Sequence, residues 1–411
     1  MLLILAGVSI SLILDNNGII KKSKDARKEY IQSQTNEQVD LDNMSDLIDE
    51  ATGRVAKIDV NTKASRNGTI NGEEGNANNP TIPKGYIPIN TETSSWGDGT
   101  SAPTQDSVDH GLVIRDDSDN EWVWIPVPDV TVMCDTANET EYTLCGTSVT
   151  TKLYSKSEII KRQTRTTPGT STSGSYREPD LVVGSDGASY DTKDTYYKTI
   201  LGFDSKEKMA EAFVAEYKEM IESIRKYGGF YIGRYELSEA GVQKGEPSLT
   251  NTNWYNLYKK CKSLNASDKV KTGMIWGCQW DATMNWLISS GAKTSDEVNK
   301  DSSSWGNYYR TSVKADDGTT EIKASEKKAV LNTGITTFTM ANNIYDLAGN
   351  CEEWTQEGTG TDSRAYRGGV YYNVGSGFTA SVLGFYYPVY GSSSIRFSSY
   401  FNNKVTLNSR A

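Results

Sequence analysis

The chain has 411 residues, a formal net charge of −10 and one histidine, His110. An acidic balance without a basic block excludes nucleic acid and anionic membrane surfaces as expected partners, and a single imidazole excludes a histidine-rich metal site. Abundant Gly, Ser, Thr, Asn and Tyr, beside sparse Leu and Ala, favour short strands and loops over helix bundles.

The cysteines give little evidence for a metal site or a disulfide framework. They are Cys134, Cys145, Cys261, Cys278 and Cys351, and no C-x-x-C pair occurs among them, so we expect no zinc site. Cys134 and Cys145 either bridge a short hairpin or are free thiols, and the odd total leaves at least one cysteine unpaired.

The chain begins with an apolar run, Leu2 to Leu14. The run is shorter than the roughly 20 residues that span a bilayer, and it lacks the positively charged start of a secretory signal. Together with "NGIIKK" after it, it resembles the second half of the N-terminal helix of type IV pilin-like proteins. The resemblance implies that residues 1–31 are the truncated end of a longer helix for membrane anchoring, pilus association or export. The alternative is an ordinary helix packed on the domain.

A polar stretch, residues 32–83, is expected to be a flexible linker because it has few large apolar residues. A compact domain, 84–411, follows it. Its first strands are predicted in "HGLVIRD" (110–116) and "EWVWIPV" (121–127), around a cluster of turn formers. Residues 135–197 are again polar, and we interpret them as an insertion.

Two stretches have the periodicity of amphipathic helices. In 205–229, Met209, Phe213, Met220 and Ile224 share one face and Gly228 ends the pattern. In 278–291, Trp280, Met284 and Leu287 share a face. Two main helices among many short strands predict an α+β fold.

Four separated stretches resemble the formylglycine-generating-enzyme-like (sulfatase-modifying factor) branch of the C-type lectin fold. They are "EWVWIPV", "GGFYIGRYE", "IWGCQWDATMNW" and "NIYDLAGNCEEWTQE" followed by "RAYRGG". They extend from about Trp122 to Arg396, and N-x-x-D-L-x-G-N-x-x-E-W followed by R-G-G is the most specific. The resemblance implies that the domain has this fold.

The residues of the last motif are expected to be mainly scaffold. Trp354 is a large buried anchor, Gly368 and Gly369 allow close approach of the backbone, and Arg367 and Arg396 frame the segment between them. In the family this turn often holds calcium, and the matching positions here are Glu353, Asn350 and the carbonyls of Gly349 and Cys351. A salt bridge or a capping role for Glu353 is the alternative.

The sequence does not support catalysis of the family type. Formylglycine-generating enzymes use a pair of cysteines after the R-G-G turn, whereas no cysteine follows Cys351 here, and the related iron enzymes need several histidines. No other catalytic set is evident. We therefore expect a protein that is not an enzyme and needs no cofactor other than calcium, if the turn binds it.

The segment 370–401 has a restricted amino-acid alphabet. Tyr, Ser, Gly and Val are frequent, and Lys, Glu, Gln, Met and Trp are absent from Gly358 to Asn403. Such a composition is typical of antibody paratopes, although a pair of Tyr-rich strands packed on the domain would also explain it. The segment resembles the variable region of diversity-generating retroelement target proteins. In those systems adenine mutagenesis of Asn codons cannot produce the five missing residue types.

This resemblance predicts a diversified binding site. The expected ligand-contacting residues are Tyr371, Tyr372, Val374, Ser376, Phe378, Ser381, Leu383, Phe385, Tyr386, Tyr390 and Ser392. The expected ligand is a protein or a glycan on another cell or phage, and the expected location is the cell surface or the exterior. The alternatives are a fixed pilin-like adhesin and a degenerate enzyme of the formylglycine-generating type.

Overall fold

The computed structural model describes residues 62–63, 76–78, 80–83, 86–89, 108–130, 133, 142–144, 147–149, 165–166, 173–174, 196–204, 206–264, 270–358, 364–389, 395–397 and 399–403. The chain divides into two compact units, Met1–Ala56 and Lys57–Ala411, and every described residue belongs to the second. The predicted helix 1–31 lies outside the described residues, as do Cys134, Cys145 and most of 32–83 and 135–197. Within the described ranges, no helix is both long enough and apolar enough to cross a bilayer.

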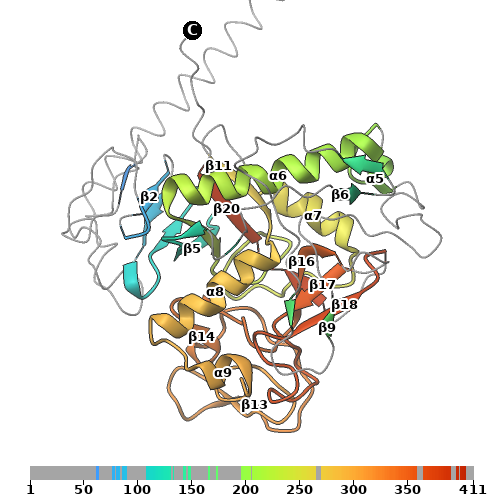
Figure 1. Ribbon diagram of the computed structural model, residues 1–411. Coiled ribbons are helices and arrows are strands. Elements are labelled where there is room, and N and C mark those ends of the chain that lie inside the picture. The colour runs from blue at the N-terminus through green and yellow to red at the C-terminus, as the bar shows by residue number, and fades with distance from the viewer. Residues whose placement is uncertain are drawn as a thin grey trace, which may run out of the picture. The chain divides into compact units, whose positions relative to one another are not determined.

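The largest sheet of the described residues has six strands (Figure 1). In spatial order they are β11 (Val270–Met274), β20 (Ser399–Asn403), β10 (Gly229–Gly233), β5 (Glu121–Pro126), β4 (Val113–Arg115) and β3 (Ile87–Pro88). All neighbouring strands are antiparallel. The last described strand, β20, therefore lies inside the sheet, between β10 and β11.

The predicted strands at 110–116 and 121–127 are confirmed as β4 and β5, which pair with Val113 opposite Val123. The turn between them is held by the buried carboxylate of Asp116. Its Oδ1 accepts hydrogen bonds from the backbone N–H groups of Ser118 (2.9 Å) and Asn120 (3.0 Å). A short acidic side chain that bonds its own backbone two residues on is a common way to form such a turn.

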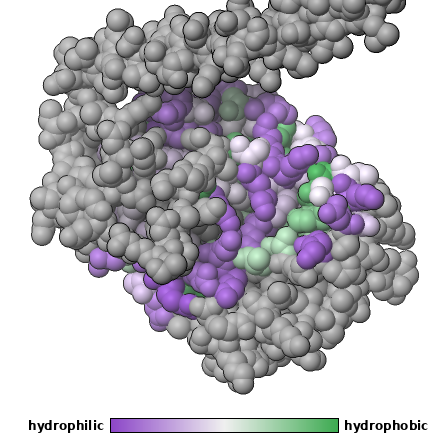
Figure 2. Space-filling view, turned by 90° about the horizontal axis from the view of Figure 1, so that it is seen from above, coloured by the Kyte–Doolittle hydropathy of each residue, from purple (hydrophilic) through white to green (hydrophobic). Residues whose placement is uncertain are grey.

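The first predicted helix is confirmed as α6 (Lys206–Tyr227). Met209, Phe213, Met220 and Ile224 are all buried, and the helix contacts β10 and β20. Figure 1 shows α6 above the six-stranded sheet and α8 below it. Seen from above, most of the described surface is hydrophilic, with a smaller hydrophobic area (Figure 2). Because Met209, Phe213, Met220 and Ile224 are buried, the apolar stripe of α6 faces the core, as its periodicity predicts.

The second predicted helix is confirmed as α8 (Gly277–Ser289), and the structure adds a shorter helix that was not predicted. A third, α7 (Trp254–Lys262), is capped by the Asn253 side chain, which accepts a hydrogen bond from the backbone N–H of Asn256 (3.0 Å). It is short and rich in aromatic residues, which have modest helix propensity. Contacts with the rest of the domain bury five of its residues: Trp254, Tyr255, Leu257, Tyr258 and Cys261.

A four-stranded sheet carries the R-G-G region. Its order is β18 (Leu383–Tyr386), β17 (Arg364–Arg367), β16 (Glu352–Gly358) and β19 (Ile395–Phe397), and β16 and β19 are parallel. The backbone N–H of Gln356 bonds the carbonyl of Ile275 just after β11, at 3.0 Å. This contact joins the two sheets.

The remaining described elements are short. They are β1 (Thr62–Lys63), β2 (Thr81–Ile82), β6 (Tyr142–Leu144), β7 (Thr147–Val149), β8 (Arg165–Thr166), β9 (Ser173–Gly174), α5 (Tyr196–Thr199), α9 (Ser295–Asn299), β12 (Val313–Lys314), β13 (Glu321–Lys323), η3 (Thr337–Thr339), β14 (Met340–Ala341) and β15 (Ile344–Tyr345). Together with the two sheets and three longer helices, they make the described unit an α+β structure, as predicted.

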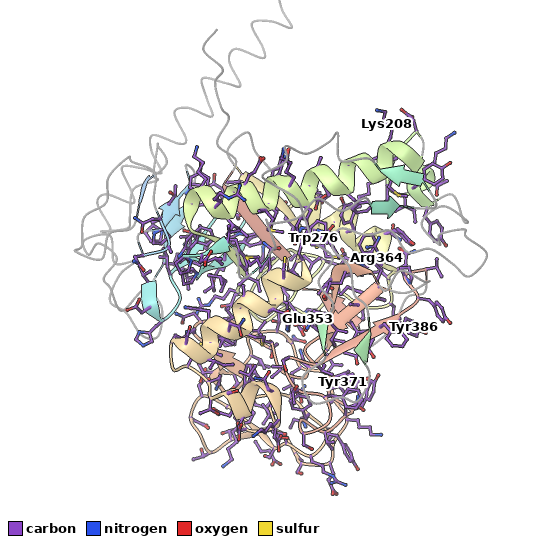
Figure 3. The ribbon with its side chains drawn as sticks, in the orientation of Figure 1. Lys208, Trp276, Glu353, Arg364, Tyr371 and Tyr386 are labelled. Atoms are coloured by element: carbon purple, nitrogen blue, oxygen red, sulfur yellow. The ribbon has the colours of Figure 1, made fainter. Side chains whose placement is uncertain are left out.

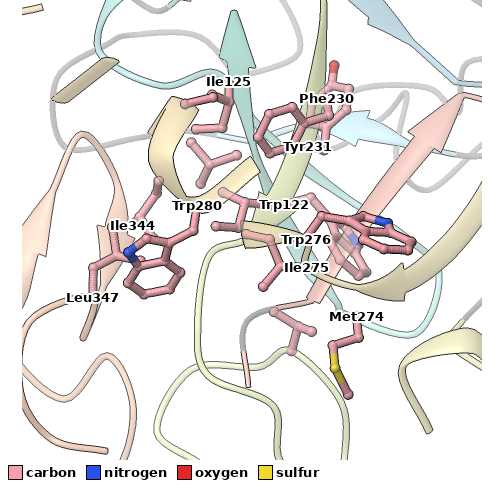
Figure 4. Close-up of a cluster of buried hydrophobic side chains, with 14 of the residues drawn as sticks. Trp122, Ile125, Phe230, Tyr231, Met274, Ile275, Trp276, Trp280, Ile344 and Leu347 are labelled. Atoms are coloured by element: carbon pink, nitrogen blue, oxygen red, sulfur yellow. The ribbon is translucent and has the colours of Figure 1, made fainter. Parts of the chain in front are cut away.

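The hydrophobic core joins the sheets and helices. Figure 4 shows Trp122 and Tyr231 of the large sheet near Trp276 and Trp280, at and within the start of α8. All four are at most 1% exposed. Large aromatic side chains bury much area each, so they account for a substantial part of the hydrophobic stabilisation.

The boundary predicted between linker and domain needs correction, because the end of the predicted linker packs on the domain. Ala77, Thr81 and Ile82 are buried. The carbonyl of Ala77 accepts a hydrogen bond from Nε1 of Trp124 (3.1 Å), and that of Thr81 accepts one from the hydroxyl of Tyr231 (2.9 Å). Residues 76–78 and 80–83 therefore belong to the folded unit.

Candidate binding surface

The Tyr-rich segment lies between Arg367 and Arg396 in the sequence. In the four-stranded sheet these two residues lie on either side of Glu353. Glu353 on β16 pairs with Arg367 on β17 and, on its other side, with Arg396 on β19. Strands in a sheet are about 4.8 Å apart, so the two arginine backbones are separated by roughly 10 Å. The sheet thus fixes both ends of the stretch between them.

Between these ends, main-chain atoms of the segment hold it on the domain. The hydrogen bonds are Tyr371 N to Asn350 O (3.0 Å), Tyr309 N to Asn373 O (2.8 Å), Ser302 N to Gly375 O (3.3 Å), Ala380 N to Ser302 Oγ (2.9 Å), Trp280 Nε1 to Ala380 O (3.1 Å), Ser381 N to Val298 O (3.3 Å) and Trp254 N to Pro388 O (3.0 Å). In each of them the segment contributes a backbone N–H or C=O. Such bonds persist when most side chains are exchanged.

Exposed aromatic side chains occur at two places in the segment. Tyr372 is 37% exposed in the first turn, and Phe385, Tyr386 and Tyr387 are 58%, 39% and 39% exposed at the end of β18. In Figure 3, Tyr371 and Tyr386 both lie at the side of the domain that carries β18. The two places offer aromatic and hydroxyl groups to solvent.

Neighbouring rings support these exposed side chains. Tyr371 and Tyr372 are in edge contact, with ring centroids 5.1 Å apart. Tyr386 lies 6.0 Å from Tyr387 and 6.4 Å from the buried anchor Trp354. Contacts of this kind limit the rotamers of the exposed rings, so that less entropy is lost when a ligand binds.

The predicted contact residues divide into groups by exposure. Tyr372, Ser376, Phe385 and Tyr386 are exposed, and Tyr371, Val374 and Phe378 are partly buried. Tyr390 and Ser392 lie outside the described residues. Tyr387 is exposed as well, although it was not among the predicted residues.

Two predicted contact residues need correction. Ser381 and Leu383 are only 6% and 5% exposed. The backbone of Ser381 bonds Val298, and Leu383 packs on Ala365 of the neighbouring strand, so both side chains face the interior. The boundaries of 370–401 change too, since Val370 is fully buried and 399–401 are part of β20.

Buried charges form a rigid base under the segment. Nε and Nη2 of Arg367 donate to the carboxylate of Glu357 at 2.9–3.0 Å, and its Nη1 lies 3.2 Å from Oδ1 of Asp281. The guanidinium of Arg364 lies 4.1 Å from the ring centroid of Trp254. Paired arginines of this kind fix β17 against α7 and α8.

The other predicted scaffold residues lie near this base. Gly368 and Gly369 have φ values of +89° and +74°, which favour glycine strongly. Trp354 is fully buried. Arg396 belongs to β19 by its backbone, and its side chain lies outside the described part of the structure.

Asn350 does not fit the predicted calcium site. Its Oδ1 accepts hydrogen bonds from Nδ2 of Asn307 (2.9 Å) and the backbone N–H of Leu331 (3.0 Å), and its Nδ2 donates to Glu236 (2.9 Å). Both lone pairs of the amide oxygen are therefore already used. Glu353, Gly349 and Cys351 alone supply fewer protein oxygens than the six to eight that calcium takes.

Two further observations concern reactive and metal-binding groups. Among the residues the structure describes, no three His, Cys, Asp or Glu side chains are grouped to hold a metal ion. The thiols of Cys261, Cys278 and Cys351 are buried. Burial keeps such thiols away from solvent and from reagents in it.

The fold and the site define an α+β protein that presents a main-chain-anchored, aromatic segment at its surface. Neither the comparison with protein-family models nor that with curated proteins finds a match. Similar solved structures include Treponema denticola variable protein 1 (14% identity, TM-score 0.29), CarF (12%, 0.30) and PvdO from Pseudomonas aeruginosa (14%, 0.26). Each likeness covers 43% of this chain, and 85%, 87% and 81% of the other chain respectively. TM-scores this low establish neither a shared fold nor a shared function.

Proposed function

We propose that the chain is a non-catalytic ligand-binding protein with the fold of the formylglycine-generating-enzyme-like C-type lectin branch. Its binding surface consists of the exposed side chains at Tyr372, Ser376, Phe385, Tyr386 and Tyr387, and these positions are diversified. The motifs from Trp122 to Arg396 support the fold. The observation that carries the binding function is the anchoring of 370–389 through its own main chain.

The physical reason is the separation of anchoring from contact. Backbone hydrogen bonds and buried residues hold the segment, while side chains with 37–58% exposure project from it at Tyr372 and 385–387. Their exchange leaves the anchoring bonds in place. The restricted alphabet without Lys, Glu, Gln, Met and Trp is what adenine mutagenesis of Asn codons can produce, and it suits adaptable recognition.

The partner that we propose is a protein or a glycan on another cell or a phage, met at the cell surface. The apolar N-terminal run, read as part of an anchor or export helix, supports this location. A fixed adhesin with the same surface is the second candidate, and the composition of 358–403 favours diversification over it.

A pair of displayed libraries tests the binding surface. One randomises Tyr372, Ser376, Phe385, Tyr386 and Tyr387, and the matched control randomises five exposed positions of α6. The control positions are Ala215, Glu219, Glu222, Arg225 and Lys226. Selection against a panel of purified proteins and glycans should enrich binders from the first library alone. Equal enrichment from both libraries, or none from a folded first library, would contradict the proposal.

Single substitutions at the five segment positions should be tolerated. Each should change the free energy of unfolding by less than about 1 kcal/mol, because the side chains are exposed. Leu383→Ala in the buried part of the segment should cost about 2 kcal/mol or more. Chemical denaturation measures both. Losses above about 1 kcal/mol at the five exposed positions would show that these side chains are needed for the stability of the fold.

The genomic locus separates diversification from a fixed adhesin. A reverse transcriptase gene beside a near-copy of the segment, with adenines at the codons of exposed positions, is the expected arrangement. A complete locus without both elements would leave the fixed adhesin as the better account.

A further inference from the structure

The loop of residues 302–311 supports the first half of the binding segment together with Asn350, and we call it the supporting loop. Its Tyr309 N–H bonds the carbonyl of Asn373 at 2.8 Å. The hydroxyl of Tyr308 donates to the carbonyl of Gly368 at 3.2 Å. The position of residues 371–378 therefore depends on the geometry of the turn at Tyr308–Thr311.

Behind this turn lies a buried lysine, Lys323, at the end of β13. The residue is 1% exposed. Its Nζ donates to the carbonyl oxygens of Tyr308 (2.8 Å), Thr311 (2.7 Å) and Lys327 (3.3 Å). Three acceptors match the three N–H donors of a charged ammonium, whereas a neutral amine has only two.

The arrangement requires the positive charge at this point. Three carbonyl dipoles that converge with their negative ends repel one another unless a cation lies between them, and the low dielectric of the interior strengthens both effects. Burial also lowers the pKa of Lys323, so the carbonyls must offset the desolvation of the ammonium. Lys314, on the paired strand β12, is exposed.

We propose that Lys323 is a positioning residue for the binding segment: its ammonium clamps the Tyr308–Thr311 turn, and this turn holds the main chain at Asn373. The inference rests on the proposed function. It explains how a surface with exchangeable side chains keeps one backbone conformation, because the clamp touches none of those side chains. A preorganised backbone reduces the entropy lost on binding, whichever ligand is bound.

Hydrogen exchange of the full chain tests the clamp without any ligand. In Lys323→Met, which keeps a chain of similar length without charge, the amides of Tyr309 and of 371–378 should exchange at least about tenfold faster. The amides of β5 (Glu121–Pro126) should exchange as in the wild type. Lys314→Met, from the same hairpin, is the matched control and should leave both regions unchanged.

Lys323→Arg keeps a positive charge and several N–H donors. It therefore distinguishes the effect of the charge on the turn from the effect of side-chain packing. Its protection at Tyr309 should lie closer to that of the wild type than to that of Lys323→Met. Unchanged exchange in Lys323→Met, or equal acceleration in β5, would overturn the proposal. If Lys323→Met does not fold, a folded Lys323→Arg with protection lost at Tyr309 would overturn it, and protection retained there would support it. The library selections are independent of this result, so either proposal can fail alone.

Discussion

At the scale of single residues, Glu352 at the start of β16 is a buried carboxyl group outside the binding segment. It is 4% exposed, and burial raises its pKa to about 8. In the unfolded chain the same carboxyl has an ordinary pKa near 4.5. Between these two values the folded state binds a proton that the unfolded state releases, so stability falls as the pH rises through this window and is level above it.

Glu352→Gln should therefore stabilise the protein in a pH-dependent way. The gain over wild type should be small near pH 4 and should grow to on the order of 4 kcal/mol by about pH 8, since glutamine removes the ionisation. Thermal or denaturant unfolding at a series of pH values measures it. Glu326→Gln, at an exposed position, is the control and should show no such trend. A gain that does not vary with pH would refute the assignment to Glu352.

At the scale of elements, helix ends show how tertiary contacts add to local rules. Gly228 after α6 and Gly291 near the end of α8 have φ values of +77° and +79°. A Cβ at Gly228 would lie 2.1 Å from the backbone nitrogen of Ala77, whereas nothing lies within 4 Å of a Cβ at Gly291. The two glycines thus share a conformation but not an environment.

Alanine substitutions at Gly228 and Gly291 should separate the conformational penalty of a positive φ from the cost of a steric clash with the backbone of Ala77. Gly291→Ala should lower the free energy of unfolding by about 1 kcal/mol, the conformational penalty alone. Gly228→Ala should lower it by about 2–4 kcal/mol, because the backbone of 76–78 must also move. Urea denaturation of the two variants checks the difference. Equal losses would mean that the packing of Ala77 contributes little.

At the scale of the whole molecule, the end of the described chain is part of the large sheet. Tyr400 and Phe401 of β20 pair with β10 on one side and with β11 on the other. The binding segment is thus followed by a strand whose loss would leave β10 and the edge strand β11 without their shared neighbour. Such a strand contributes ladder hydrogen bonds on both edges.

A chain that ends at Ser398 should therefore lose cooperative unfolding and become sensitive to protease, whereas a chain that ends at Asn403 should behave like the wild type. Circular dichroism melts and limited proteolysis measure both. A cooperative transition in the shorter chain would show that the sheet does not need β20.

The amino-acid sequence by itself determined what short-range physics controls. The periodicity of apolar residues located α6 and α8, the run of turn formers located the β4–β5 hairpin, and Gly228 marked a helix end. Each signal is local, because helix faces, turns and left-handed residues depend on neighbours a few positions away. The restricted alphabet of 370–401 is also visible only in the sequence.

Tertiary structure alone decided what depends on contacts between distant parts of the chain. Helix α7 forms although its sequence is short and aromatic, Ser381 and Leu383 turn inward while Tyr387 stays exposed, and β20 lies inside a sheet. The burial of Lys323 among carbonyls and of Glu352 at a strand end has no signature in the local sequence. Burial, register and desolvation are set by residues far apart in sequence, and these determine which side chains of the segment can reach a ligand.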